Sequence, residues 1–352
     1  MKKVVTVDGN ISPSELGITL PHEHLLWDFT CWCIPPDRFS KTPLIDAPVT
    51  LEILGDLRRD SLISKDNCRL YDVNIAISEL TRYKKFGGSS LVDTTLPGIG
   101  RDPLAIRAIS RATGVNVVCG TGWYVDASHP DYVKSKSVDE LVTIMVRELT
   151  EGIDDTGIRT GVIGEIGCSD PLTKNERKVL QAAGRAQVKT GAPLNIHPAL
   201  YNKKEERYVK KGGEPVDLIH NEGAESSKIY ISHMDLTLSD LEYHRALIDK
   251  YGVTLSYDCF GNEDYKESYS LGMGGLSDRQ RVKALVELLK SGYEKHLMVS
   301  SDTCSKMQLR KYGGYGYAHI LENIVPMLQF EGITQKQIRT MLVENPKRIL
   351  SW

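Results

Sequence analysis

Gly17-Ile-Thr-Leu-Pro-His-Glu-His24 is a short apolar run that ends in two histidines one residue apart. Similar β-rich runs recur along the chain, and stretches with helical periodicity lie between most of them. The runs are Gly17–Leu20, Ser90–Val92, Val115–Val118, Gly161–Ile163, Pro193–Ile196, Lys228–Ile231, Val253–Tyr257 and Leu297–Val299. Strands that alternate with helices form a parallel sheet. Eight such units predict a (β/α)8 TIM barrel, an α/β fold.

Helices are predicted at Leu104–Thr113, Val138–Glu151, Glu176–Thr190 and Asp278–Ser291, and a last apolar helix is predicted at Gln335–Leu350. Several of these helices are followed by glycine, which favours a helix C-cap. The segment from Leu25 to about Asn74 breaks the repeat and is rich in proline. We interpret it as an elaborated first βα loop. Two interpretations of its role stay open: a cover over the mouth of the barrel, or a surface excursion without a catalytic role.

The composition is that of an ordinary soluble protein, with 352 residues, a net charge of -2 and 41% hydrophobic residues. No linker divides the chain, and α/β barrels of this size fold as one unit, so residues 1–352 are expected to form a single domain. The near-neutral charge gives no electrostatic footprint for nucleic acid or an anionic membrane. No stretch approaches the ~20 apolar residues of a membrane span.

The N-terminal apolar run is interrupted by Asp8 and Asn10, so no signal peptide is expected. The seven cysteines are scattered and odd in number, which is unlike a secreted disulfide scaffold. We expect reduced thiols in a cytoplasmic protein. The Cys31-Trp-Cys33 pair is too solitary for a structural zinc site, which needs four ligands.

Ligand-type side chains stand where the predicted strands end. They are His22, His24, Glu165, His197, His233 and Asp302. Catalytic residues of α/β barrels gather at the carboxyl ends of the strands, and the alternation of a strand places both histidines of His-x-His on one face. Four imidazoles and two carboxylates suit zinc, manganese or cobalt.

Each of these residues has a plainer explanation when it is taken alone. A histidine after a strand is usually a core or loop residue, Glu165 could be an ion-pair partner, and Asp302 a helix N-cap. Their joint placement at five strand ends indicates a metal site instead. The other histidines fit no such pattern and are left unassigned: His129, His220, His244, His296 and His319.

Six motifs together resemble the phosphotriesterase-related branch of the amidohydrolase superfamily over nearly the whole chain. They are Leu20-Pro-His-Glu-His-Leu25, the run from Gly152 to Cys168, Asn195-Ile-His-Pro198, Ile231-Ser-His-Met-Asp235, Ser300-Ser-Asp302 and Gly313-Gly-Tyr-Gly-Tyr317. The resemblance implies two divalent metal ions, zinc first and manganese or cobalt as alternatives. It also implies a small-molecule substrate and a homodimer.

The resemblance assigns the more buried metal to His22, His24 and Asp302, and the more exposed one to His197 and His233. Phosphotriesterases proper bridge the two metals with a carboxylated lysine at the end of strand 4. Here Glu165 stands in that place and is expected to bridge them, with a mononuclear site as the open alternative. Two such ions lower the pKa of a shared water, so that hydroxide attacks the substrate at neutral pH.

Residues around the metals are expected to complete the chemistry. Asp302 would take the proton of the attacking water and pass it to the leaving group. Asp235 would orient a ligand or receive that proton, or else act as a plain loop or N-cap carboxylate. Tyr124, in Gly122-Trp-Tyr124, matches a tyrosine of related lactonases and would donate a hydrogen bond to a developing oxyanion. The alternative is an aromatic ring that only packs at the barrel rim.

The substrate is expected to be carboxylic rather than a phosphotriester. The relay histidine of true phosphotriesterases is absent, because the matching stretch reads Tyr257-Asp-Cys-Phe260. The run that continues from Glu165 resembles animal phosphotriesterase-related proteins and implies hydrolysis of an N-acyltaurine-type amide.

We therefore expect hydrolysis of a carboxylic amide, ester or lactone with a small anionic group. Lys306, Arg310 and Lys311 would clamp that group, or they are solvated surface cations. Organophosphate triester hydrolysis is the alternative reaction. A catalytically weak binding protein on the same barrel is the alternative to an enzyme.

Overall fold

Eight parallel strands form one sheet with the order β14-β13-β12-β9-β8-β7-β6-β3 in the computed structural model, which describes residues 2–36, 39–202, 207–265 and 275–352. The strands are β3 (Thr19–Glu23), β6 (Ser90–Asp93), β7 (Asn116–Thr121), β8 (Val162–Gly167), β9 (Leu194–His197), β12 (Ile229–Ile231), β13 (Thr254–Tyr257) and β14 (Leu297–Val299). Each of the eight predicted runs overlaps one of these strands. The predicted barrel is confirmed.

Side chains close the barrel between its first and last strands. The hydroxyl oxygen of Ser300, just after β14, lies 2.8 Å from the backbone oxygen of His22 in β3. Inside the barrel, Val92, Val118, Val162, Tyr230 and Met298 of five different strands pack in one buried cluster. This layer fills the barrel below its mouth, as expected for a packed core rather than a pore.

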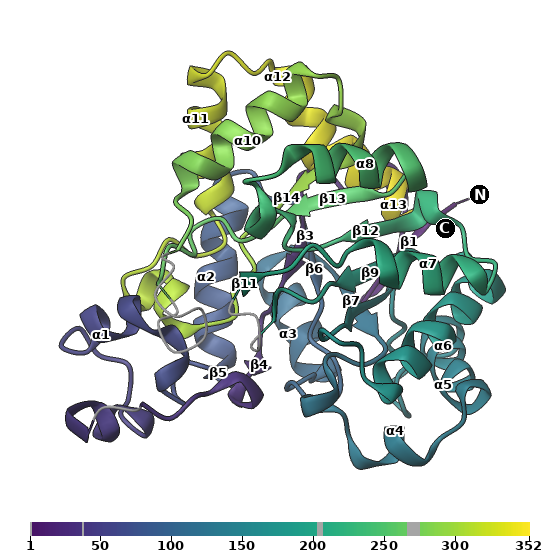
Figure 1. Cartoon of the computed structure of the whole chain (residues 1–352), viewed down its shortest axis with the longest axis horizontal. Coiled ribbons are helices and arrows are strands. Elements are labelled where there is room, and N and C mark those ends of the chain that lie inside the picture. Colours follow the sequence, from purple (N-terminus) through teal and green to yellow (C-terminus); the bar gives the residue numbers. More distant parts are fainter. Residues whose placement is uncertain (1, 37–38, 203–206, 266–274) are drawn as a thin grey trace.

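Helices surround the strands (Figure 1). They are α2 (Val73–Lys85), α3 (Pro103–Thr113), α5 (Val138–Thr150), α6 (Lys174–Thr190), α7 (Gly213–Asn221), α8 (Leu241–Tyr251) and α10 (Asp278–Lys290), with the short α4 (Asp131–Ser135) before α5. The four predicted helices are all present. Capping boxes begin α5 at Ser137, α6 at Thr173 and α10 at Ser277.

The predicted C-terminal helix is present but irregular. It consists of α12 (Gln335–Arg339), a π-helical turn (Thr340–Glu344) and α13 (Asn345–Leu350), with Pro346 near the start of α13. A further helical segment after β14, which the sequence analysis does not identify, comprises a π-helical turn (Ile320–Ile324) and α11 (Val325–Phe330). Both segments pack on the barrel through buried apolar residues such as Leu328 and Leu342.

The elaborated first βα loop is confirmed. It contains the antiparallel pair β4 (Trp27–Asp28) and β5 (Arg69–Leu70), the short helix α1 (Leu54–Arg59) and several 3-10 turns. It forms the purple projection at the left of Figure 1. Small antiparallel pairs also occur as β1 (Val4–Thr6) with β2 (Gly9–Ile11), and as β10 (Tyr201–Asn202) with β11 (Arg207–Tyr208).

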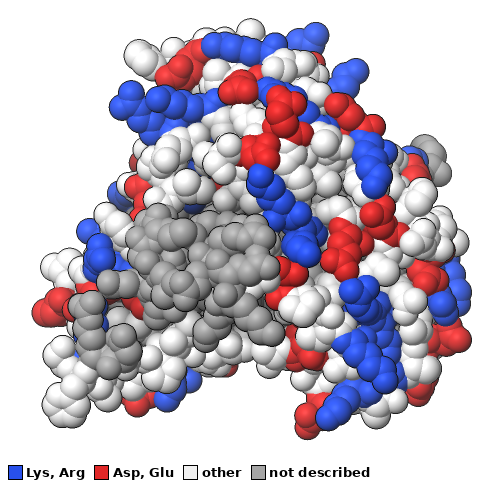
Figure 2. Space-filling view, viewed as in Figure 1, with Lys and Arg blue, Asp and Glu red and all other residues white. Residues whose placement is uncertain are grey.

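The described surface carries charges of both signs. Lysine and arginine alternate with acidic side chains over the described part of the face in Figure 2, in keeping with the net charge of -2. None of the helices in the described ranges combines the length and apolar character that a membrane crossing requires. None of the seven cysteines forms a disulfide bond.

Candidate metal centre

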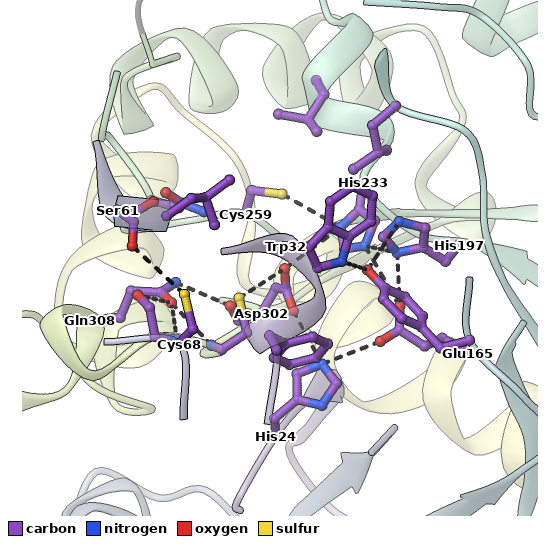
Figure 3. Close-up of a pocket in the computed structure, with 18 residues that line it drawn as sticks. His24, Trp32, Ser61, Cys68, Glu165, His197, His233, Cys259, Asp302 and Gln308 are labelled. Carbon is purple, nitrogen blue, oxygen red and sulfur yellow. Dashed lines mark hydrogen bonds and ion pairs between the residues drawn. The ribbon is translucent and has the colours of Figure 1, made fainter. Parts of the chain in front are cut away.

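The six predicted ligand residues meet at the carboxyl ends of the strands. His22 and Glu165 lie within β3 and β8, His24 follows β3, and His197 ends β9. His233 and Asp302 lie in the loops just after β12 and β14. Five of the six, His24, Glu165, His197, His233 and Asp302, line a cavity of about 790 Å³, including its open mouth (Figure 3). The barrel therefore brings together residues that are up to 280 positions apart.

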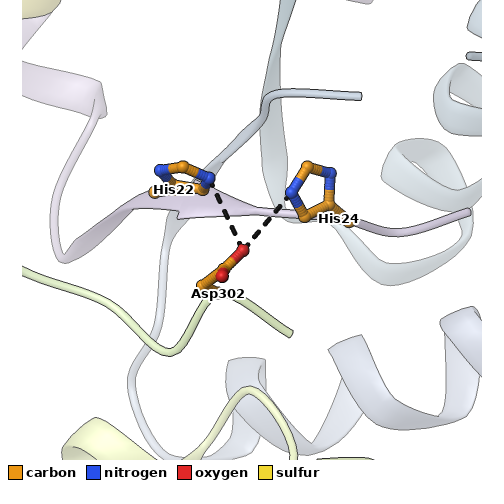
Figure 4. A group of neighbouring side chains, drawn as sticks. All are labelled: His22, His24 and Asp302. Atoms are coloured by element: carbon orange, nitrogen blue, oxygen red, sulfur yellow. Dashed lines mark ion pairs between the residues drawn. The ribbon is translucent and has the colours of Figure 1, made fainter. Parts of the chain in front are cut away.

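One half of the centre is formed by His22, His24 and Asp302 (Figure 4). The Nε2 atoms of His22 and His24 lie 3.5 and 3.4 Å from Oδ1 of Asp302. They also lie 3.4 and 3.3 Å from Oε2 and Oε1 of Glu165. Two imidazoles and two carboxylates thus converge on one point.

The other half is formed by His197, His233 and Glu165. Nδ1 of His197 lies 2.9 Å from Oε2 of Glu165 and 2.9 Å from Nε2 of His233. Nε2 of His233 is 3.8 Å from the same carboxylate oxygen. Because its two oxygens together contact the imidazoles of both halves, Glu165 lies between them.

The donor atoms fit a metal ion. The Nε2 atoms of His22 and His24 are buried and make no hydrogen bond to any described residue. A buried nitrogen without a partner is costly unless something binds it. In a tetrahedral zinc site, ligand atoms at 2.0–2.1 Å from the metal are separated by roughly 3.3–3.4 Å. The four separations of 3.3–3.5 Å around His22 and His24 agree with that spacing.

Backbone irregularities aim several of the ligands. The β3–β6 register shifts between Leu20 and Glu23, across His22, and the β8–β9 register shifts between Ile163 and Ile166, across Glu165. Such bulges redirect side chains next to active sites. Only three described residues other than glycine have a positive φ, and two of them are His233 (57°) and Asp302 (45°). Uncommon left-handed backbone of this kind concentrates at functional sites.

Gly164 is required by the approach of β9 to the backbone before Glu165. Its φ is +117°, and a Cβ atom there would lie 2.3 Å from the backbone oxygen of Asn195. Any side chain at this position would push β8 away from β9. Gly164 therefore allows the close packing of β8 and β9 that brings the Glu165 carboxylate to the barrel axis.

The carboxylate of Asp258 supports the ligands, and the sequence analysis misses this role. It lies 3.2 Å from Nδ1 of His22 and 2.9 Å from Nδ1 of His233, and it accepts the His233 backbone N–H at 2.7 Å. Thr95 contacts Nδ1 of His24 at 2.9 Å. These partners leave the opposite nitrogens free to face the centre. Asp258 directly follows β13, so the strand-end rule that found the ligands could also have found it.

The electrostatics are those of a cage with excess negative charge. Burial by itself lowers the pKa of His22 and His24, but the surrounding carboxylates raise it to about 10 and about 9. Burial raises the pKa of Glu165 and Asp302, yet the facing imidazoles hold both below their ordinary values. The pKa of His197 is lowered by burial and by His233. Without a metal, protons on imidazoles balance the carboxylates, and a divalent cation would replace those protons.

Tyr124 lies in the cavity wall beside the centre, as predicted. Its hydroxyl is 3.3 Å from Nε2 of His197, and burial raises its pKa well above 10. Asp235 does not face the cavity. Its carboxylate binds Nε of the buried Arg281 at 2.6 Å and accepts the Asp258 backbone N–H at 3.3 Å. Asp235 therefore supports Asp258, which in turn contacts the ligands.

The predicted cationic clamp is not formed. Lys306 pairs with Asp66 at 2.6 Å, and Arg310 and Lys311 are exposed. None of the three lines the cavity, and its described lining contains no lysine or arginine. The other interpretation, surface cations, fits Arg310 and Lys311. Lys306 fixes the loop after β14 to the first βα loop.

The first βα loop forms one wall of the cavity. It contributes Phe29, Trp32, Ser61, Leu62 and Cys68 to the lining. Phe29 packs edge-on against His24 at 4.8 Å between ring centroids and against Tyr124 at 5.7 Å. Of the two interpretations of this loop, a place at the site therefore fits better than a surface excursion. Nothing in its sequence periodicity marks Phe29 or Trp32 as site residues.

Residues 2–350 match the model of the phosphotriesterase family. N-acetyltaurine hydrolase of Xenopus tropicalis is 40% identical over 351 residues, which cover 99% of this chain and 98% of that protein. The human N-acetyltaurine hydrolase is 37% identical with the same coverage. The resemblance inferred from the motifs is confirmed.

Solved structures agree with this likeness. A resiniferatoxin-binding protein from Rhodobacter sphaeroides superposes with a TM-score of 0.93 at 37% identity, covering 99% of this chain and 94% of that one. The organophosphorus hydrolase from Deinococcus radiodurans superposes with a TM-score of 0.75 at 28% identity, covering 99% and 96%. The fold thus recurs in proteins whose names refer to different small molecules.

Proposed function

The chain belongs to the phosphotriesterase family, and we propose that it is a binuclear metal-dependent hydrolase of a carboxylic amide, ester or lactone that carries a small anionic group. An N-acyltaurine-type amide is the substrate we place first. This choice is supported by relatives named N-acetyltaurine hydrolase that are 37–40% identical over 99% of the chain.

The observation that carries the proposal is the pair of unpartnered, buried Nε2 atoms of His22 and His24. Together with Asp302 they would hold one ion, and His197 and His233 would hold the second. Glu165 would bridge the ions through its two oxygens, because each half of the centre contacts this carboxylate. Histidine and carboxylate ligands suit zinc first, and manganese or cobalt also fit them.

Divalent ions held there supply Lewis acidity, which lowers the pKa of a bound water and polarises the carbonyl oxygen of the substrate. Asp302 is the residue we expect to take the proton of that water. Its side chain is 13% exposed, whereas those of the five other ligands are 5% exposed or less, so water and substrate reach it most easily. The facing imidazoles keep it ionised and able to accept a proton.

Two side chains of the cavity wall would handle the substrate. Tyr124 would donate a hydrogen bond to the oxygen on which negative charge develops. Asn262, which also lines the cavity, offers an uncharged amide to the polar tail of the substrate. The apolar wall of Phe29, Trp32 and Leu62 would exclude water from the reacting bond.

Metal analysis and a substrate panel test this proposal together. The protein is stripped with a chelator and reloaded with zinc, manganese or cobalt, and its metal content is measured by mass spectrometry. Release of taurine from N-acetyltaurine is then compared with hydrolysis of an aryl ester, a lactone and an aryl phosphotriester. We expect about two ions per chain, and amide turnover that requires them. His220→Ala is the matched control, because this exposed histidine of α7 lies outside the cage.

The outcomes separate the alternatives. Fewer than about one ion per chain after reloading would contradict the proposed metal centre and favour a binding protein. Two ions with no turnover of any substrate would overturn the hydrolase. Faster hydrolysis of the phosphotriester than of the carboxylic substrates would identify an organophosphate triester hydrolase. The stretch Tyr257-Asp-Cys-Phe260 speaks against that last outcome, since it holds no histidine where the resemblance places the relay.

A further inference from the structure

The hydroxyl of Tyr124 lies between two ring nitrogens. Nε1 of Trp32, from the first βα loop, donates to it at 3.3 Å, and Nε2 of His197 lies 3.3 Å away. Both aromatic rings meet the tyrosine edge-on, at centroid distances of 6.4 and 4.7 Å. The phenol ring is 4% exposed, so its orientation is fixed by packing.

The directions of these hydrogen bonds follow from the chemistry of the rings. An indole N–H only donates, so the Tyr124 oxygen accepts from Trp32. A neutral imidazole that binds a metal through one nitrogen carries its hydrogen on the other. Nδ1 of His197 faces Glu165 and His233, which makes it the ligand atom of the proposed centre. Nε2 of His197 then carries the hydrogen and also donates to Tyr124.

With two donors directed at its oxygen, Tyr124 has its own hydrogen left for a third partner, and its ring lines the cavity. We propose that Trp32 is a positioning residue that, together with metal-bound His197, turns the Tyr124 hydroxyl into a hydrogen-bond donor to the substrate. This inference rests on the proposed function. It assigns to the first βα loop a part in the reaction, beyond covering the mouth.

The two contacts of the Tyr124 hydroxyl, with Nε1 of Trp32 and with Nε2 of His197, are both made by buried or half-buried groups at 3.3 Å. A tyrosine whose hydroxyl accepts such bonds can be followed by its vibrations without any substrate.

Tyrosine vibrations provide the first test. Ultraviolet resonance Raman spectra of the wild type minus Tyr124→Phe isolate this phenol, and the intensity ratio of its ring doublet distinguishes a donating from an accepting hydroxyl. We expect the ratio of an accepting hydroxyl in the zinc-loaded wild type. In zinc-loaded Trp32→Phe, which loses one donor but keeps an aromatic ring, the ratio should move away from the accepting form. The same ratio in the wild type and in Trp32→Phe would overturn the inference.

A double-mutant cycle provides the second test. Tyr124→Phe should lower kcat about 10²-fold, as for loss of an oxyanion donor. Trp32→Phe should lower kcat about 10-fold with KM nearly unchanged, because the interaction is made only in the transition state. In the Tyr124→Phe background Trp32→Phe should have no further effect. Trp123→Phe is the matched control, since its Nε1 donates to the hydroxyl of Tyr132, outside the cavity lining, at 3.1 Å.

The readouts separate this inference from the proposed function. Zinc content should be the same in all variants, because none of them removes a ligand. A Raman change caused by Trp32→Phe in a protein without hydrolase activity would contradict the proposed function and support the hydrogen-bond assignment. If the wild type is an active hydrolase but the effects of Trp32→Phe and Tyr124→Phe on kcat are additive, the role of Trp32 would be contradicted and the proposed function would stand.

Discussion

Replacing Asp258 by asparagine would weaken metal binding at both halves of the centre. Its carboxylate lies 3.2 Å from Nδ1 of His22 and 2.9 Å from Nδ1 of His233, and these two imidazoles belong to opposite halves. Asparagine keeps the size of the side chain and one oxygen, which can still accept the His233 backbone N–H. It loses the negative charge that polarises the two rings.

The expected loss follows from the number of ligands involved. Removing a supporting carboxylate behind a metal-bound histidine typically weakens metal affinity 10–100-fold, or about 1.4–2.7 kcal/mol per ion. Because Asp258 serves one ligand of each ion, both dissociation constants should rise. Chelator competition, read as zinc occupancy against free zinc, resolves the two steps. The change in kcat/KM at saturating zinc should be smaller than the change in affinity.

Asp278→Asn is the matched control for this experiment. Asp278 is also a buried aspartate paired with a histidine, since it contacts Nε2 of His319 at 2.6 Å, but it touches no candidate ligand. This control should bind zinc as the wild type does. If Asp258→Asn also kept both affinities, the assignment of Asp258 as the support of both halves would be wrong. If Asp258→Asn weakened the binding of only one ion, Asp258 would support only that half of the centre.

Three further predictions concern protons, backbone and charge. Apparent zinc affinity should rise from about pH 6 to about pH 9, because zinc must displace protons from the imidazoles of His22 and His24, whose pKa values are raised to about 10 and about 9. A zinc affinity measured by calorimetry that did not change with pH would contradict this. Gly164→Ala should lower the free energy of unfolding in urea by about 3 kcal/mol or more, since its Cβ would lie 2.3 Å from the Asn195 oxygen. Gly191→Ala, the control, has open space around its Cβ and should lower this free energy by about 1–2 kcal/mol. The double variant Arg310→Ala, Lys311→Ala should leave KM within about two-fold of the wild type, because neither side chain lines the cavity. A large rise in KM would show that these two cations do bind the substrate.

The regular parts of the fold are predictable because they are local. Alternation of β-rich runs with helices gives the barrel, and the strand-end rule then gathers residues as distant as His22 and Asp302 into one site. The predicted strand Gly161–Ile163 is too short, however, since β8 runs to Gly167. Gly164 and Glu165 interrupt the apolar pattern because function, rather than burial, dictates their identity. A periodicity argument ends a strand at the point where the site begins.

The supporting residues are harder to predict because their partners are set by tertiary contacts. The position of Asp258 at the end of β13 marks it as a candidate, but its contact with His22 depends on how β13 and β3 are placed in the closed barrel. Trp32 reaches Tyr124, 92 residues away, from a loop without periodicity. For the basic loop after β14, the sequence predicts a site that the structure does not form. Its composition indicates an anion site, but Lys306 is held by Asp66.

The middle residue of His22-Glu-His24 explains how the third ligand of this half is held. Strand alternation points both histidines to the centre and Glu23 to the opposite side, toward the loop after β14. Its carboxylate accepts from the Ser300 hydroxyl at 2.7 Å and from the backbone N–H groups of Ser301 and Thr303 at 2.7 and 2.9 Å. These three residues flank Asp302, whose φ of 45° costs energy and persists only where its neighbours are fixed. The outer residues of the motif therefore face the candidate metal centre directly, and the middle one holds the strained loop that presents Asp302 to this centre.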